Sequence, residues 1–235
     1  MMAGLDGEIH VYRLSLSEET SQPFRQTIDL LAPDERERAD RYRYAPAKRS
    51  FVRVRVALRI LLSHYLGQTA ESIRFDLGAT GKPRLAGTAP DQGLVFNVSH
   101  SGDVGLIAFA KDTALGVDVE RIRTMAYQDA MAERCFSAGE LACWKGLPEA
   151  HRETAFFSFW SCKEAFVKAS GEGIALGLNA CVVDLSDRPR MVSVPDRCGK
   201  AVDWRLTEIP AGDAHRAAVC HRGEPRSVQV ADYVP

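Results

Sequence analysis

Apolar residues change their spacing twice along this 235-residue chain, each time from a helical period to strand-like runs. They first recur at helical spacing over residues 51–65, up to a stop at Gly67, and short apolar runs separated by turn residues follow. A second helical pattern covers residues 154–170, and strand-like runs close the chain. Helices followed by strands therefore occur twice. This order predicts two α+β halves packed side by side, which divide near residues 111–115.

Local signals predict the remaining elements. Pro33 suits the first turn of a charged helix, and Ser137 with Glu140 forms a capping box that predicts another helix start. A helix is also expected to begin at Ser17 and to run towards Leu31, since acidic residues follow the serine. The predicted strands cover residues 9–14, 73–77, 94–98, 104–110, 115–122, 181–185, 204–209, 217–221 and 228–231, and the charged helix covers 34–44.

Composition and charge exclude several classes of protein. Hydrophobic residues make up 46% and charged residues 26%, which is typical of a globular protein with a core. A formal net charge of −1 does not favour wholesale binding to nucleic acid. No apolar run approaches the roughly 20 residues that span a bilayer, and Arg59 interrupts one candidate. We expect no membrane association and no signal peptide. The six scattered cysteines contain no CxxC, which favours a reducing, cytoplasmic setting over a disulfide or zinc framework.

Two acidic residues lie on one face of the predicted strand at 115–122. Side chains alternate along a strand, so Asp118 and Glu120 share a face, roughly 7 Å apart, while the apolar residues point the other way. Neighbouring carboxylates repel one another unless a positive group lies between them, and a hard cation such as Mg²⁺ suits these oxygen ligands. The alternative is a half-exposed strand whose outer face is simply acidic.

The helix predicted at 154–170 carries a further carboxylate. Trp160, Glu164 and Lys168 are successive i, i+4 neighbours, so they line one side of an aromatic helix. Glu164, framed by Lys163 and Lys168, could be a third metal ligand. It could equally take part in an ordinary ion pair on the helix surface.

A short segment between two predicted strands contains Ser99 and His100. Small residues there let backbone N–H groups approach an anion, and His100 could donate to a phosphate oxygen. A plain turn is the competing interpretation. A Ser–His catalytic dyad is disfavoured, because neighbours on an extended backbone point apart.

Basic residues crowd the two helices predicted over residues 34–66. Arginine forks suit phosphate geometry, and Lys82 is held extended by the proline that follows it. Acidic residues are interleaved, so many of these charges only solvate a helix face, and two or three are expected to contact a ligand. The basic residues are Arg36, Arg38, Arg41, Arg43, Lys48, Arg49 and Arg53.

The combined motifs resemble those of the Sfp-type 4′-phosphopantetheinyl transferases. They read GKP, FNVSHSG, GVDVER and FWSCKEAFVKASGEG in this order, after the Arg-rich RSFVRVRVALR, and the resemblance spans about Pro33 to Ile174. It implies two similar α/β subdomains related by a pseudo-twofold axis, with the active site in the cleft between them. Residues 1–112 would bind the nucleotide and phosphates of coenzyme A. Residues 113–235 would carry the metal site and the catalytic helix.

The resemblance also implies roles for individual residues. Asp118, Glu120 and Glu164 would hold Mg²⁺, with Mn²⁺ as a possible substitute, and Lys168 would contact phosphate. Lys82 would lie near the adenine, and Ser99 with His100 would bind the nucleotide's phosphates. Arg49, and more weakly Arg38, match residues that hold the 3′-phosphate. Glu35 stands where some members carry a lysine, so this set of contacts is open.

The implied activity moves 4′-phosphopantetheine from coenzyme A to a serine of an apo acyl or peptidyl carrier protein and releases 3′,5′-ADP. Glu164, directly or through a metal-bound water, is the candidate base, and Lys168 would offset charge in the transition state. Two alternatives use the same residues: a magnesium-dependent phosphohydrolase of nucleotides or coenzyme A, and a module that binds coenzyme A without turnover. Residues 123–135 are the expected docking site for the carrier, and a monomer is expected.

Overall fold

Two β-sheets form the centre of the protein. The computed structural model describes residues 5–17, 28–89 and 93–234. The first sheet has the strand order β11-β1-β5-β4 and the second the order β6-β10-β9. Their strands are β1 (Glu8–Ser15), β4 (Leu94–Ser101), β5 (Val104–Lys111), β11 (Ser227–Asp232), β6 (Leu115–Arg121), β9 (Trp204–Glu208) and β10 (His215–Arg222).

Helices and two small hairpins surround these sheets. The helices are α2 (Pro33–Asp40), α3 (Ala45–Leu66), α4 (Gln128–Cys135), α5 (Ala138–Gly146) and α6 (Glu149–Ser170). The hairpins pair β2 (Phe75–Leu77) with β3 (Pro83–Leu85), and β7 (Val182–Asp184) with β8 (Arg190–Ser193). Short 3₁₀ turns lie at Ala70–Ser72, Ile174–Leu176, Leu178–Ala180, Asp196–Cys198 and Ala201–Asp203.

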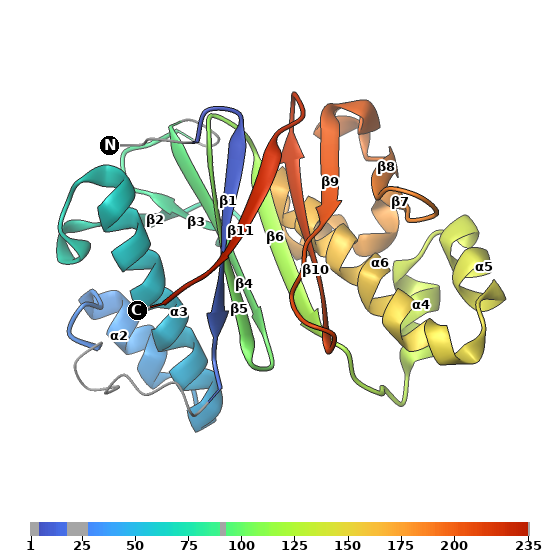
Figure 1. Ribbon diagram of the computed structural model, residues 1–235, viewed down its shortest axis with the longest axis horizontal. Helices are drawn as coiled ribbons and strands as arrows, with labels where there is room; N and C mark the ends of the chain where they lie inside the picture. The colour runs from blue at the N-terminus through green and yellow to red at the C-terminus, as the bar shows by residue number, and fades with distance from the viewer. Residues whose placement is uncertain (1–4, 18–27, 90–92, 235) are drawn as a thin grey trace.

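The elements stack in four layers, helix, sheet, sheet, helix, as Figure 1 shows from left to right. Helix α3 packs on the outer face of the first sheet, through a core that includes Leu58, Leu62 and Phe109. Helix α6 packs on the second sheet through another core. A third apolar cluster, with Val11 of β1 and Val219 of β10, joins the two sheets. The predicted fold class, an α+β chain with two α/β units, is confirmed.

The two long helices end where the sequence predicts. Helix α3 stops at Gly67 and α6 at Gly171, both in the left-handed region with φ of 63° and 75°. Glycine adopts this conformation without steric cost, which explains its use after a helix. The capping box is also present, since the Ser137 side chain accepts from the Glu140 N–H.

The last strand joins the first half of the chain. Strand β11 pairs in parallel with β1, and its Val228 and Val230 pack into the cluster between the sheets. The predicted second half, residues 113–235, includes this strand, but β11 belongs to the sheet of the first half. Alternation along a strand marks its buried face but not its neighbour, so the sequence pattern does not reveal this crossover.

Other segments also differ from the sequence-based prediction. Ser99 and His100 lie within β4, which continues to Ser101, so the turn of the hairpin is only two residues long. The charged helix ends at Asp40, and α3 begins at Ala45. Strands β3 and β8 and helix α4 have no predicted counterpart. Residues 18–27 of the helix expected after Ser17 lie outside the described residues. Among those described, no helix is both long and apolar enough to cross a membrane.

Candidate active site

A seam between β4 and β6 joins the two halves. These strands belong to different sheets but lie in contact, and side chains of β4 take the place of backbone partners. Alternate residues of β4 point at β6, and each accepts a hydrogen bond from a backbone N–H. The three bonds run from Val117 N to Asn97 Oδ1 (2.8 Å), from Val119 N to Ser99 Oγ (3.3 Å) and from Arg121 N to Ser101 Oγ (3.1 Å).

Asp118 lies buried beside this seam, with 3% of its surface exposed. Its Oδ1 accepts hydrogen bonds from Ser99 Oγ at 2.9 Å and from Lys168 Nζ at 2.6 Å. Its Oδ2 is buried and has no hydrogen-bond partner. Burial raises the pKa of Asp118 to about 6, although the Lys168 ammonium opposes this rise.

Glu120 occupies the next position on the same face of β6. Its Oε2 accepts from Ser101 Oγ at 2.9 Å, and the Arg123 guanidinium lies 3.5 Å away. The side chain is 22% exposed, so Glu120 lies nearer the surface than Asp118. The spacing of two residues places both carboxylates along one edge of the seam, as alternation predicts.

Lys168 reaches the seam from the last turn of α6. Its ammonium donates to Asp118 Oδ1, to Ser99 Oγ at 2.9 Å and to the Val117 carbonyl at 3.3 Å. This reach depends on Gly116 of β6. A Cβ at that position would lie 2.1 Å from the Ala165 carbonyl oxygen and 2.4 Å from the Ala169 nitrogen. Helix and strand therefore touch backbone to backbone at this point.

Glu164 lies one turn before Lys168 on α6. Trp160, Glu164 and Lys168 are all half-buried, on a face of the helix that otherwise packs against the core. Burial raises the pKa of Glu164; Lys168 opposes the rise and Glu120 adds to it. Lys168 lowers the pKa values of Asp118 and Glu164, and the neighbouring carboxylates raise them, so the three carboxylates and Lys168 lie close enough to interact electrostatically.

His100 points away from Ser99, as expected for neighbours on a strand. The residue is exposed, yet partial loss of hydration lowers the pKa of His100, and Lys168 lowers it further while Glu120 opposes. The lowered pKa favours the neutral imidazole, which lies near the carboxylate–lysine cluster. A Ser–His dyad is not formed.

Lys82 connects the halves at the other end of β6. Its Nζ donates to the carbonyls of Leu115 and Lys168, both at 2.8 Å, and Thr80 Oγ1 donates to the Gly171 carbonyl at 2.9 Å. The turn between β2 and β3 thus closes on the C-terminal end of α6. A pocket of about 250 Å³ lies there, lined by residues 78–80, 82–85, 88–89, 94–96 and 169–171.

Several charged side chains of α2 and α3 pair with one another inside the protein. Glu35 is buried and pairs with Arg59 at 2.7 Å and with Arg55 at 3.5 Å, so it stabilises the packing of α2 on α3. Arg38 remains exposed, with its guanidinium 5.3 Å from the centre of the Phe51 ring. Arg49 is half-buried near the start of α3. Both Arg38 and Arg49 belong to the first half, whereas the carboxylates belong to the second.

The carboxylates are the part of this site that suits a metal ion. Over residues 5–17, 28–89 and 93–234, no three His, Cys, Asp or Glu side chains gather closely enough to hold one. Lys168 and Arg123 instead neutralise Asp118 and Glu120. The buried, unpartnered Asp118 Oδ2 and the half-buried Glu120 and Glu164 are oxygen donors of the type Mg²⁺ prefers. The chemistry of these donors therefore suits a hard divalent cation, while among the described residues the three carboxylates do not converge on one point.

Several residues around the site are not identified by the sequence pattern. Asn97 and Ser101 lie two residues before and two residues after Ser99, so on a strand all three side chains share one face. Because residues 99–101 are predicted as a loop, the sequence does not reveal this shared face. Lys163 does not frame Glu164. It is fully buried, pairs with Glu140 at 2.7 Å and donates to three backbone carbonyls, because adjacent helix residues point about 100° apart.

The protein consists of two α/β units, and a cluster of carboxylates with a lysine lies where the two units meet. Family models agree with this description: "4′-phosphopantetheinyl transferase superfamily" matches residues 114–220, and "4′-phosphopantetheinyl transferase, N-terminal" matches residues 18–112. The chain belongs to the 4′-phosphopantetheinyl transferase superfamily, and within it to the Sfp type.

Named relatives extend over most of the chain. The 4′-phosphopantetheinyl transferase HetI of Nostoc sp. is 32% identical over 93% of this chain and 90% of its own length. The transferase psf-1 of Bacillus pumilus is 31% identical over 90% of this chain and 89% of its own length. The transferase Sfp of Bacillus subtilis is 27% identical over 93% of both chains.

Proposed function

We propose that this protein transfers the 4′-phosphopantetheine group of coenzyme A to a serine of an apo acyl or peptidyl carrier protein and releases 3′,5′-ADP. The observation that carries the proposal is the cluster of Asp118, Glu120, Glu164 and Lys168 at the seam of a chain whose relatives bear the name of this activity. Residues 1–112 would contribute most of the nucleotide site. Residues 113–235 would contribute the carboxylates and the catalytic helix.

The carboxylates would hold Mg²⁺, or Mn²⁺ in its place, through Asp118, Glu120 and Glu164. Bound there, the ion would act as a Lewis acid that offsets the charge of the diphosphate. Lys168 would have to shift from Asp118 towards the phosphate oxygens, and its long flexible side chain permits this. In the transition state its ammonium would balance the negative charge that develops on the leaving group.

The nucleophile belongs to the partner protein. The serine oxygen of the carrier forms a bond to the phosphorus that bears pantetheine, and the diphosphate P–O bond breaks, so its electron pair leaves with 3′,5′-ADP. The serine proton needs an acceptor. Glu164 is the proposed base, since its raised pKa brings it closer to the pH at which proton transfer is efficient.

The nucleotide would lie between the halves. The pocket beside Lys82 is a concave site next to the Lys168 turn, and it would accept the adenine. Ser99 and His100 are proposed near the phosphates; the neutral His100 imidazole can donate a hydrogen bond there. Arg49 and Arg38 are proposed for the 3′-phosphate, because an arginine fork matches phosphate oxygens.

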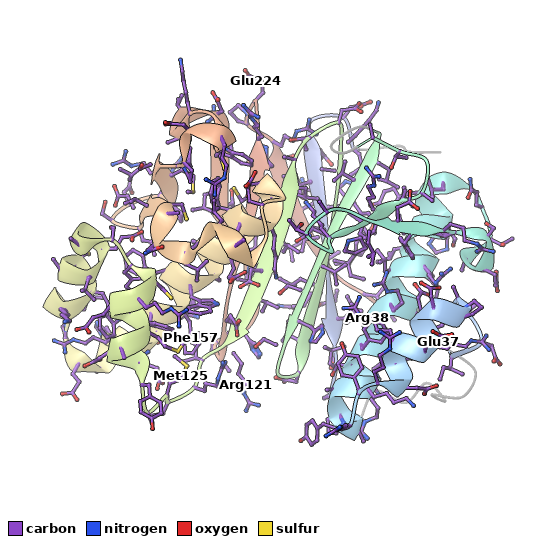
Figure 2. The ribbon with its side chains drawn as sticks, turned by 180° about the vertical axis from the view of Figure 1, so that it is seen from behind. Glu37, Arg38, Arg121, Met125, Phe157 and Glu224 are labelled. Atoms are coloured by element: carbon purple, nitrogen blue, oxygen red, sulfur yellow. The ribbon has the colours of Figure 1, made fainter. Side chains whose placement is uncertain are left out.

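The carrier protein is proposed to dock on residues 123–135, next to the carboxylates. Tyr127 is 78% exposed there, and Met125 packs against the core of the second half. The Arg123 guanidinium lies 5.3 Å from the centre of the Phe157 ring. Figure 2 labels Met125 and Phe157 on the half that carries Arg121, the last residue of β6, and Arg38 on the opposite half. We propose that the enzyme works as a cytoplasmic monomer.

The test is to incubate the protein with coenzyme A, Mg²⁺ and a panel of apo carrier proteins, and to record intact masses. At least one carrier should gain the mass of a single phosphopantetheine, and both EDTA and Glu164→Ala should abolish the gain. Cleavage of coenzyme A without modification of any carrier would support a phosphohydrolase instead. Binding of coenzyme A without any reaction would support a module that only binds it.

A further inference from the structure

Two serines of β4 each contact both a backbone N–H and a carboxylate of β6. Ser99 accepts from Val119 N and donates to Asp118, while Ser101 accepts from Arg121 N and donates to Glu120. A backbone N–H can only donate, so the hydroxyl oxygen must be the acceptor of that bond. An ionised carboxylate can only accept, so the single hydroxyl proton goes to the carboxylate. The hydroxyl proton of Ser99 therefore points to Asp118, and that of Ser101 points to Glu120.

The surroundings leave these hydroxyls little freedom to turn elsewhere. Ser99 is buried and also accepts from Lys168 Nζ at 2.9 Å, so its two lone pairs and its proton are all engaged. Ser101 is half-buried, and its proton lies on the side of Glu120 Oε2. Arg123 also contacts Glu120, but its side chain is 53% exposed and its nitrogen lies 3.5 Å from the carboxylate oxygen. An exposed pair at that distance orients a carboxylate weakly.

We propose that Ser101 is a positioning residue for Glu120, and that Ser99 has the same function for Asp118. Each hydroxyl holds one carboxylate oxygen at the seam and leaves the other oxygen of that carboxylate for a divalent cation. The unpartnered Oδ2 of Asp118 agrees with this division. The inference rests on the proposed function, because it assigns these carboxylates to a metal. It makes the junction of the two halves a part of the metal site.

Asn97 offers a matched control. It accepts a backbone N–H of β6 in the same way, at Val117, but it donates to neither carboxylate. Asn97→Ala removes one bond of the seam and leaves both serine–carboxylate bonds. Ser101→Ala removes the seam bond and the bond to Glu120 together. Ser101→Thr keeps the hydroxyl on a residue that suits a strand.

The experiment measures binding of Mn²⁺ alone by electron paramagnetic resonance, together with the Mg²⁺ concentration that gives half-maximal transfer. Ser101→Ala should weaken both about 10- to 100-fold, the usual effect of losing a residue that orients a metal ligand. Ser101→Thr should restore them, and Asn97→Ala should bind Mn²⁺ within about threefold of wild type. Circular dichroism confirms that each variant folds.

Three results would overturn the proposal: wild-type Mn²⁺ affinity in Ser101→Ala, equal weakening in Asn97→Ala, or no Mn²⁺ binding by the wild-type protein. Mn²⁺ binding is read without a carrier. A wild-type protein that binds Mn²⁺ and modifies no carrier would therefore count against the proposed function alone, and the comparison of the variants would still decide the role of Ser101.

Discussion

Substitution of Gly116 by alanine should disable the site through a single methyl group. The new Cβ would lie 2.1 Å from the Ala165 carbonyl oxygen and 2.4 Å from the Ala169 nitrogen, and neither backbone atom can rotate away. An ordinary contact needs about 3.4 Å, so α6 must move from β6 by about 1.3 Å. Glu164 and Lys168 are each adjacent in sequence to one of these residues and would move with the helix. The 2.6 Å contact of Lys168 with Asp118 would be lost.

Misplacement of a catalytic group by about 1 Å costs about 10²-fold in rate, and overpacking costs about 1–3 kcal/mol of stability. Gly116→Ala should therefore lower kcat about 100-fold in a carrier-modification assay, while the protein remains folded in denaturant titrations. Gly139→Ala on α5 is the control, because no atom lies within 4 Å of its added Cβ. A kcat within about threefold of wild type, in a stably folded Gly116→Ala, would refute the reasoning.

Three further substitutions test other parts of the structure. Burial lowers the pKa of His221 to about 4 from an ordinary 6.5, so the unfolded chain takes up the proton first as the pH falls. Between pH 7 and pH 5 the wild-type protein should lose about 2 kcal/mol of stability that His221→Leu keeps; equal losses in urea titrations would contradict this. Lys163→Met leaves Glu140 buried and unpaired and should cost about 3–5 kcal/mol, whereas a cost below about 1 kcal/mol would show that the pair contributes little. Glu164→Gln should lower kcat on the order of 10²–10⁴-fold without unfolding the protein, and a nearly normal rate would exclude Glu164 as the base.

Much of the fold follows from local patterns in the sequence. The helical period up to Gly67 and the end of α6 at Gly171 identify the two long helices, and alternation identifies the strands. The partners of each strand do not follow, because alternation specifies only a buried face. The pairing of β11 with β1 connects segments more than 200 residues apart, and no local signal marks it.

The site follows from the sequence only in part. Spacing places Asp118 and Glu120 on one face of β6, and it aligns Glu164 with Lys168. Their approach to one another depends on Gly116 and on the seam with β4, which are tertiary features. The opposite roles of Lys163 and Lys168 also depend on packing, since both residues follow one helical pattern but only Lys163 is fully buried.

The central claim is that phosphopantetheine leaves coenzyme A only to enter a carrier protein. The most direct measurement counts both products in one reaction, the 3′,5′-ADP by chromatography and the modified carrier by intact mass. The account predicts one 3′,5′-ADP for each carrier modified and neither product without a carrier. With Glu164→Gln both products should form more slowly, on the order of 10²–10⁴-fold. Release of 3′,5′-ADP at an unchanged rate without any carrier would contradict it.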